Sequence, residues 1–84
     1  MPITEILTSI EFTRDVKPLD NSLRVKLDKQ VDKIIENPDV GKPLRYDMKG
    51  ERTIYIKPYR LIYKVEGETL FLLRFEHRKD AYKR

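Results

Sequence analysis

Three segments with strand character follow one another in the second half of the chain and are separated only by short turns. Residues 52–57, 59–65 and 69–76 are rich in Ile, Val, Leu, Tyr and Phe, which favour β-strands. Lys57-Pro58 makes the first turn, and Glu66-Gly67-Glu68 is a tight connection in which glycine can take a positive φ. This half therefore predicts a three-stranded meander that needs a second layer over one face.

The first half supplies that layer. Residues 6–12 alternate apolar and polar side chains, as a half-buried strand does, and Thr13 can cap a short helix through Leu19. A longer helix is expected between the cap candidates at 20–22 and Asn37-Pro38, since the residue before proline avoids helical geometry. Its apolar residues fall on one stripe: Leu23, Leu27, Val31, Ile34 and Ile35. Residues 39–43 are predicted to be a loop.

The expected fold is a single α+β domain over residues 1–84. An N-terminal strand and two helices precede the meander, and both helices pack on one face of a mainly antiparallel sheet.

Alternation along the strands predicts which side chains meet the helices. Because burying unpaired Lys or Arg costs several kcal/mol, the more apolar set is expected to face them. That set is Ile54, Ile56, Leu61, Tyr63, Val65, Phe71, Leu73 and Phe75, which leaves Leu70 and Leu72 on the other side. The uncovered face then gathers Tyr55, Lys57, Arg60, Lys64 and Arg74, with Glu76 as its only acid.

Charge is unevenly distributed. Residues 1–41 hold six Lys or Arg against eight acids, and residues 42–84 hold twelve against six, for a net charge of +4. A basic half favours a polyanion or an acidic protein as partner, although a solvated basic surface is the plain alternative.

Several classes of site are excluded by composition. No cysteine and one histidine leave no disulfide, thiolate metal site or multi-histidine zinc site, and no metal or cofactor is expected. The N-terminus lacks a secretory layout, and no apolar run approaches the ~20 residues that span a bilayer. A cytoplasmic protein that does not enter a membrane is expected.

The sequence contains the residue types that RNA cleavage needs. Few are required, because the RNA substrate supplies its own nucleophile, the 2′-hydroxyl. Arginine can stabilise the phosphorane, and histidine or tyrosine can exchange protons. The candidate catalytic residues are Arg60, Arg74, His77 and Tyr82, and the candidate RNA-binding residues are Tyr55, Lys57, Lys64, Arg78 and Lys79. Each has a structural alternative: His77 can bond at a strand end, Tyr82 can cover the core, and the arginines can pair with Glu76 or with a partner's carboxylate. The residue types alone favour a nuclease and a basic binding module equally.

Four motifs then point to a family. Residues 37–44, NPDVGKPL, resemble the "NP..GKPL" connector of RelE/ParE-superfamily toxins. Residues 58–65, PYRLIYKV, resemble their "DYRVIYEV" strand, and residues 77–82, HRKDAY, their terminal "HR..VY". Residues 12–15, FTRD, match the entry into the first helix. The resemblance covers roughly residues 10–84 in order and with compatible spacing.

The resemblance implies a toxin that an antitoxin neutralises in a hetero-oligomer. RelE-like members cut mRNA in the ribosomal A site, whereas ParE-like members poison DNA gyrase. Arg60 matches the arginine that grips the scissile phosphate, Tyr82 a terminal tyrosine proposed as acid or base, and His77 a histidine used by related members.

One departure bears on activity. Thr53 and Tyr55 stand where well-studied RelE proteins carry lysines, and Lys57, facing the same way, is the better substitute. The leading hypothesis is a metal-independent ribonuclease toxin with mRNA, the ribosome and an acidic antitoxin as partners. A ParE-like gyrase inhibitor and an inactive relative that only binds antitoxin are the alternatives.

Overall fold

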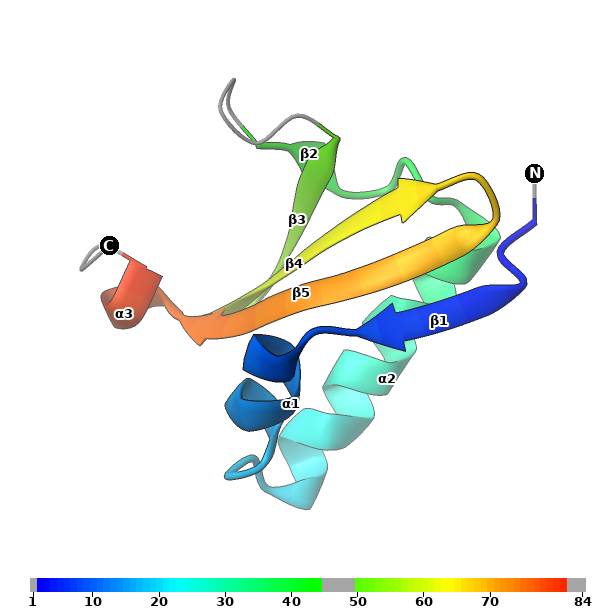
Figure 1. Cartoon of the computed structure of the whole chain (residues 1–84). Coiled ribbons are helices and arrows are strands. Elements are labelled where there is room, and N and C mark those ends of the chain that lie inside the picture. The colour runs from blue at the N-terminus through cyan, green and yellow to red at the C-terminus, as the bar shows by residue number, and fades with distance from the viewer. Residues whose placement is uncertain (1, 45–49, 82–84) are drawn as a thin grey trace.

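The computed structural model describes residues 2–44 and 50–81, which contain one five-stranded sheet in the order β1-β5-β4-β3-β2. β1 runs parallel to β5, and the other neighbouring strands are antiparallel. Figure 1 shows α1 and α2 on one face of this sheet, which confirms the predicted α+β fold. The elements are β1 (Glu5–Thr8), α1 (Ile10–Val16), α2 (Asn21–Glu36), β2 (Lys42–Pro43), β3 (Glu51–Ile56), β4 (Tyr59–Glu66), β5 (Thr69–His77) and α3 (Arg78–Ala81).

The long helix begins and ends as predicted. The Asp20 side chain caps α2 by accepting a hydrogen bond of 2.9 Å from the Leu23 N–H, and the helix ends at Glu36, just before Asn37-Pro38. Leu27 and Ile34 lie in the core, with the rest of the predicted stripe packed against it. Three strands of the meander also form within a residue or two of their predicted bounds, and Gly67 takes the expected positive φ.

The first strand and first helix meet earlier than predicted. Ser9, not Thr13, caps α1: its Oγ accepts the Phe12 N–H at 2.9 Å and donates to the Leu73 carbonyl at 2.6 Å. β1 therefore ends at Thr8, and α1 ends at Val16 rather than Leu19. The apolar–polar pattern of residues 6–12 suggested one strand because Phe12 is buried, but Phe12 is buried as part of α1.

The segment predicted to be a loop contains a short strand. Lys42 and Pro43 pair with Thr53 and Arg52, which adds β2 to the edge of the sheet. The Arg52 Nη1 donates to the Gly41 carbonyl at 2.7 Å, which fixes the start of this strand against β3.

The same connector is held from the core side by Tyr63. Its hydroxyl donates to the Pro38 carbonyl at 2.8 Å and accepts the Gly41 N–H at 2.9 Å. A Cβ on Gly41 would lie 2.8 Å from the Tyr63 ring, so glycine is required for this approach. Burial raises the pKa of Tyr63 above its ordinary value.

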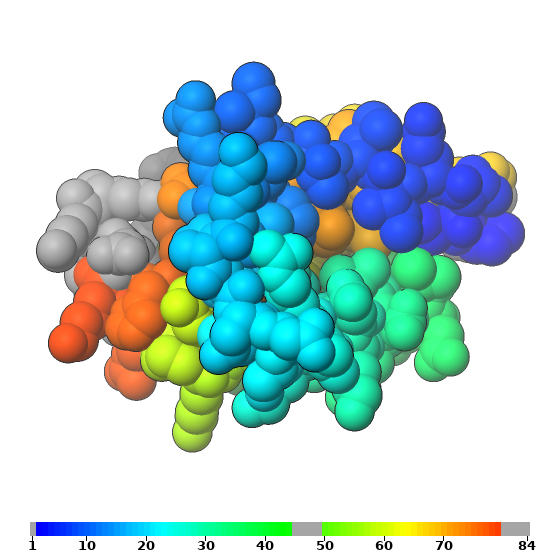
Figure 2. All heavy atoms as spheres, turned by 90° about the horizontal axis from the view of Figure 1, so that it is seen from below, coloured from blue at the N-terminus to red at the C-terminus, as the bar shows by residue number. Residues whose placement is uncertain are grey.

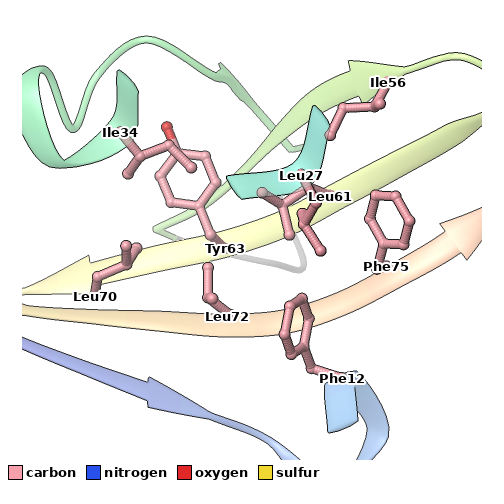
Figure 3. Close-up of a cluster of buried hydrophobic side chains, with 9 residues drawn as sticks. All are labelled: Phe12, Leu27, Ile34, Ile56, Leu61, Tyr63, Leu70, Leu72 and Phe75. Atoms are coloured by element: carbon pink, nitrogen blue, oxygen red, sulfur yellow. The ribbon is translucent and has the colours of Figure 1, made fainter. Parts of the chain in front are cut away.

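The core lies between α1, α2 and the sheet (Figure 3). In β5 the helix-facing residues are Leu70, Leu72 and Phe75, so the predicted inward position of Phe71 and Leu73 is wrong. A β-bulge causes the change: Ile62 pairs with Arg74 while Tyr63 pairs with Leu72, which leaves one extra residue in β5. The bulge shifts the alternation by one position between Leu72 and Phe75.

Seen from the helix side, α1 and α2 cross the middle of the molecule, the end of β5 (orange) lies beside α1, and α3 (red) lies beyond it (Figure 2). Within residues 2–44 and 50–81, no helix is both long and apolar enough to cross a bilayer.

Candidate functional site

Arg60 points away from the helices because its neighbour Leu61 points into the core. Its cross-strand partner is Glu76 in β5. The Arg60 Nε and Nη2 both donate to Glu76 Oε1, at 3.2 and 3.1 Å. The Glu76 side chain is only 2 % exposed, so a buried carboxylate holds this arginine.

Arg74 reaches the same carboxylate from the other side. Its Nη2 lies 3.8 Å from Glu76 Oε2, while its Nε donates to Asp15 Oδ2 at 2.9 Å. The hydrogen bond to Asp15 is the main reason that the pKa of Arg74 is raised. Asp15, Arg74, Glu76 and Arg60 thus form one row of alternating charges, which we call the arginine–carboxylate chain.

The predicted basic face is less positive than its sequence suggested. Glu76 was expected to be its only acid, but Asp15 comes from α1 to pair with Arg74, and Lys64 forms an ion pair with Glu66 at 3.1 Å. The Arg60 and Arg74 side chains remain 24 % and 32 % exposed, so both arginines are partly accessible to solvent.

His77 lies on the other side of β5. Its ring packs edge-on against Tyr59 at 5.2 Å between centroids, and the Tyr59 ring stacks on the core residue Phe75 at 4.8 Å. His77 Nδ1 accepts the Lys79 N–H at 3.1 Å, which leaves Nε2 as the ring nitrogen that can contact a ligand. Arg60 and His77 therefore leave the sheet toward opposite faces.

A cleft of about 410 Å³ joins these two sides where α1 meets the end of β5. Arg74, Glu76 and His77 line it together with Arg14 and the Tyr59 ring. Arg14 was not among the predicted site residues, since only the packing of α1 against β5 brings it there. Its place in the FTRD motif was the one available signal.

The predicted RNA-binding residues lie on β3, β4, the turn between them and α3. Tyr55 is 60 % exposed and is the cross-strand partner of Arg60. The Lys64 ammonium lies over the Phe71 ring, 5.3 Å from its centre, as a cation–π contact. Lys57, Arg78 and Lys79 are exposed at the β3–β4 turn and in α3. Tyr82 lies outside the described residues.

The centre of this face is closed to solvent. Thr53 and Ile62 are cross-strand partners that point away from the helices, yet they are 5 % and 2 % exposed. Thr53 Oγ1 is buried and has no hydrogen-bond partner in the part of the chain that the structure describes.

Comparison with known proteins finds similar sequences and folds among toxins. Residues 5–82 match the family model described as the ParE toxin of the type II toxin–antitoxin system parDE. Over 47 residues the chain is 43 % identical to Toxin RelG of Mycobacterium tuberculosis. That alignment covers 54 % of this chain and 54 % of RelG, so it spans about half of the relative's length.

Solved structures agree on the fold. The RelBE2 toxin–antitoxin complex of Mycobacterium tuberculosis aligns with a TM-score of 0.78 at 26 % identity, over 93 % of this chain and 94 % of that one. The Escherichia coli DinJ–YafQ complex aligns with a TM-score of 0.77 at 23 % identity, covering 93 % and 96 %. The intact E. coli RelBE complex aligns with a TM-score of 0.76 at 23 % identity, covering 87 % and 94 %.

Proposed function

Because this chain belongs to the ParE toxin family of type II toxin–antitoxin systems, within the RelE/ParE superfamily, we propose that it is a toxin that cleaves mRNA on the ribosome without a metal. One observation carries the proposal. Two partly exposed guanidinium groups, from Arg60 and Arg74, converge on a single anion, the Glu76 carboxylate. The planar guanidinium group of arginine can donate two parallel hydrogen bonds to phosphate oxygens, and it keeps its positive charge at any working pH.

The reaction needs three roles. The 2′-oxygen attacks the neighbouring phosphorus, the bond to the 5′-oxygen breaks, and a 2′,3′-cyclic phosphate remains on one product. Arg60 and Arg74 stabilise the charge of the phosphorane. His77 Nε2 and the Tyr82 hydroxyl take the proton from the 2′-hydroxyl and return one to the leaving 5′-oxygen. The proposal is supported by a cleft that both Arg74 and His77 line; Arg60 is not among its lining residues and would contact the phosphate from the far side of Glu76.

The surrounding side chains hold the RNA. Exposed Tyr55 provides a ring on which a base stacks, and such stacking contributes about 1–3 kcal/mol per base. Lys57, Lys64, Arg78 and Lys79 contact the backbone through charge, which makes binding depend on salt.

The proposed protein partner is an acidic antitoxin that forms a hetero-oligomer with this chain in the cytoplasm. Its support is the family and the basic second half of the chain. A carboxylate-rich segment that folds on binding is the chemistry that such a surface attracts.

Primer extension on a translated message after induction tests the proposal. The wild type is expected to give ribosome-dependent cuts and to stop growth, and Arg60→Ala to lose about 10²–10³ in cleavage rate while remaining folded by circular dichroism. Lys29→Ala, which removes one positive charge from the exposed side of α2, is the matched control and should cut normally. If Arg60→Ala, His77→Ala and Tyr82→Phe all stay fully toxic, the site assignment is wrong.

A second candidate is ParE-like inhibition of gyrase. It is favoured by Thr53 and Tyr55 in place of two family lysines, and by the carboxylates that already engage both arginines. Supercoiling defects and DNA damage without mRNA cuts would support it. Growth that is untouched by overexpression would instead indicate an inactive relative that only binds antitoxin.

A further inference from the structure

We propose that Glu76 is a built-in competitor for the phosphate site: its carboxylate occupies the position between Arg60 and Arg74 and weakens phosphate binding there. This inference rests on the proposed function for its biological meaning, because the phosphate concerned is the scissile phosphate of RNA. Its physical content is a statement about two guanidinium groups and one carboxylate, and inorganic phosphate alone can test it.

The geometry of the Glu76 carboxylate is that of a bound anion. One oxygen accepts two hydrogen bonds from Arg60, at 3.2 and 3.1 Å, and the other faces Arg74 Nη2 at 3.8 Å. Arg74 directs its Nε and Nη2 to Asp15, at 2.9 and 3.4 Å, so a phosphate in place of Glu76 would meet the Nε–Nη2 edge of Arg60 and the Nη2 of Arg74. The side chain is 2 % exposed, so water does little to screen it from a phosphate placed beside it.

The charges of the arginine–carboxylate chain explain why affinity is lowered. The two carboxylates of Asp15 and Glu76 balance the two guanidinium groups. These four side chains therefore carry no net charge when all are ionised. A phosphate that docks on the exposed edges of Arg60 and Arg74 meets the repulsion of Glu76, and one that docks between them must displace it. Either way Glu76 opposes binding.

A competing Glu76 and a positioning Glu76 predict opposite changes in phosphate affinity when the carboxylate is neutralised. If Glu76 only holds Arg60 in a productive orientation, neutralising it should loosen the arginine and weaken phosphate binding. If Glu76 competes, Glu76→Gln should bind phosphate more tightly, even though the loss of an ion pair lowers stability. Glutamine keeps the size and one acceptor oxygen, so it changes charge with little change in shape.

The experiment is a titration of the full chain with inorganic phosphate, followed by the Nε–Hε NMR signals of Arg60 and Arg74. Glu76→Gln is expected to lower the dissociation constant about tenfold relative to wild type, the scale of one close charge near a protein surface. Glu36→Gln removes the same charge from the exposed last residue of α2 and should stay within about twofold of wild type. A Glu76→Gln protein that binds phosphate no more tightly than wild type overturns the proposal.

Two further arms keep the test decisive. If Glu76→Gln does not fold, Glu76→Met replaces it: methionine removes the charge and keeps a side chain of similar length, so tighter phosphate binding is again expected, and unchanged or weaker binding overturns the proposal. RNA cleavage is measured on the same proteins. Tighter phosphate binding by Glu76→Gln, with no RNA cut by any variant, would uphold the competitor and reject the ribonuclease.

Discussion

Arg74 Nε lies 2.9 Å from Asp15 Oδ2, and this contact joins the end of β5 to α1. β1 pairs with β5 only as far as Leu72, so within residues 2–44 and 50–81 no strand lies beside the rest of β5 on that side. Asp15 fills the gap, because the same carboxylate oxygen accepts the Phe75 N–H at 2.9 Å. A helix side chain thus does for β5 what a neighbouring strand would do, and it orients Arg74 at the same time.

Asp15→Ala is therefore expected to destabilise the fold by about 2 kcal/mol, since it leaves a backbone donor and a guanidinium without their acceptor. Urea unfolding followed by circular dichroism measures the change. Asp32→Ala, on the exposed side of α2, should stay within about 0.5 kcal/mol of wild type. Equal effects of the two substitutions would show that the Asp15 contacts contribute little.

Gly41→Ala is expected to cost about 1–3 kcal/mol of unfolding free energy, as overpacking does in a close-packed site. The added Cβ would lie 2.8 Å from the Tyr63 ring and 2.9 Å from the Thr53 carbonyl oxygen. The neighbouring Val40→Ala, at a 44 % exposed position, is the control for which little change is expected. A fully stable Gly41→Ala protein would mean that the connector can move away from β4.

Tyr63→Phe tests the same contact through pH. Burial raises the pKa of Tyr63 in the folded protein, while the unfolded chain has the ordinary value of about 10. The stabilisation from the neutral phenol is complete below that value and is lost as pH rises above it, because the unfolded chain releases the proton first. The advantage of wild type over Tyr63→Phe in unfolding free energy should therefore shrink as pH is raised from about 8 to about 11. A constant difference would contradict the burial of the hydroxyl.

Thr53→Val is expected to stabilise the protein. Valine keeps the branched shape that suits β3 and removes a buried hydroxyl that has no partner in the described residues, which costs about 1–3 kcal/mol. A rise in the urea midpoint equivalent to about 1 kcal/mol is the predicted result. Thr13→Val, at an exposed position of α1, should give no such gain. A loss of stability in Thr53→Val would show that the Thr53 hydroxyl stabilises the folded protein.

Local signals predicted most of the fold. Asp20 and Asn37-Pro38 bound α2 because capping and proline geometry depend on a few adjacent residues. Gly67 marks the β4–β5 turn for the same reason. The start of α1 was missed because Ser9 caps the helix while also bonding to the Leu73 carbonyl, a contact with a residue far along the chain.

The candidate site could be predicted only in part. Strand alternation placed Arg60 and Glu76 together, and they are in contact. The bulge beside Leu73 could not be read from alternation, which assumes an uninterrupted ladder, and so Leu70 and Leu72 were assigned to the wrong face. The pairing of Arg74 with Asp15 depends on how α1 packs against β5, which no local pattern records.

We propose that this chain cuts RNA through the 2′-hydroxyl of its substrate. The most direct measurement supplies purified toxin to ribosomes programmed with two messages, one of them carrying a single 2′-deoxynucleotide at the mapped cut site. We expect the ordinary message to yield a 2′,3′-cyclic phosphate end and the deoxy message to remain intact at that position. Cleavage of both messages alike, or an end that carries a free 3′-hydroxyl, would rule out attack by the 2′-hydroxyl.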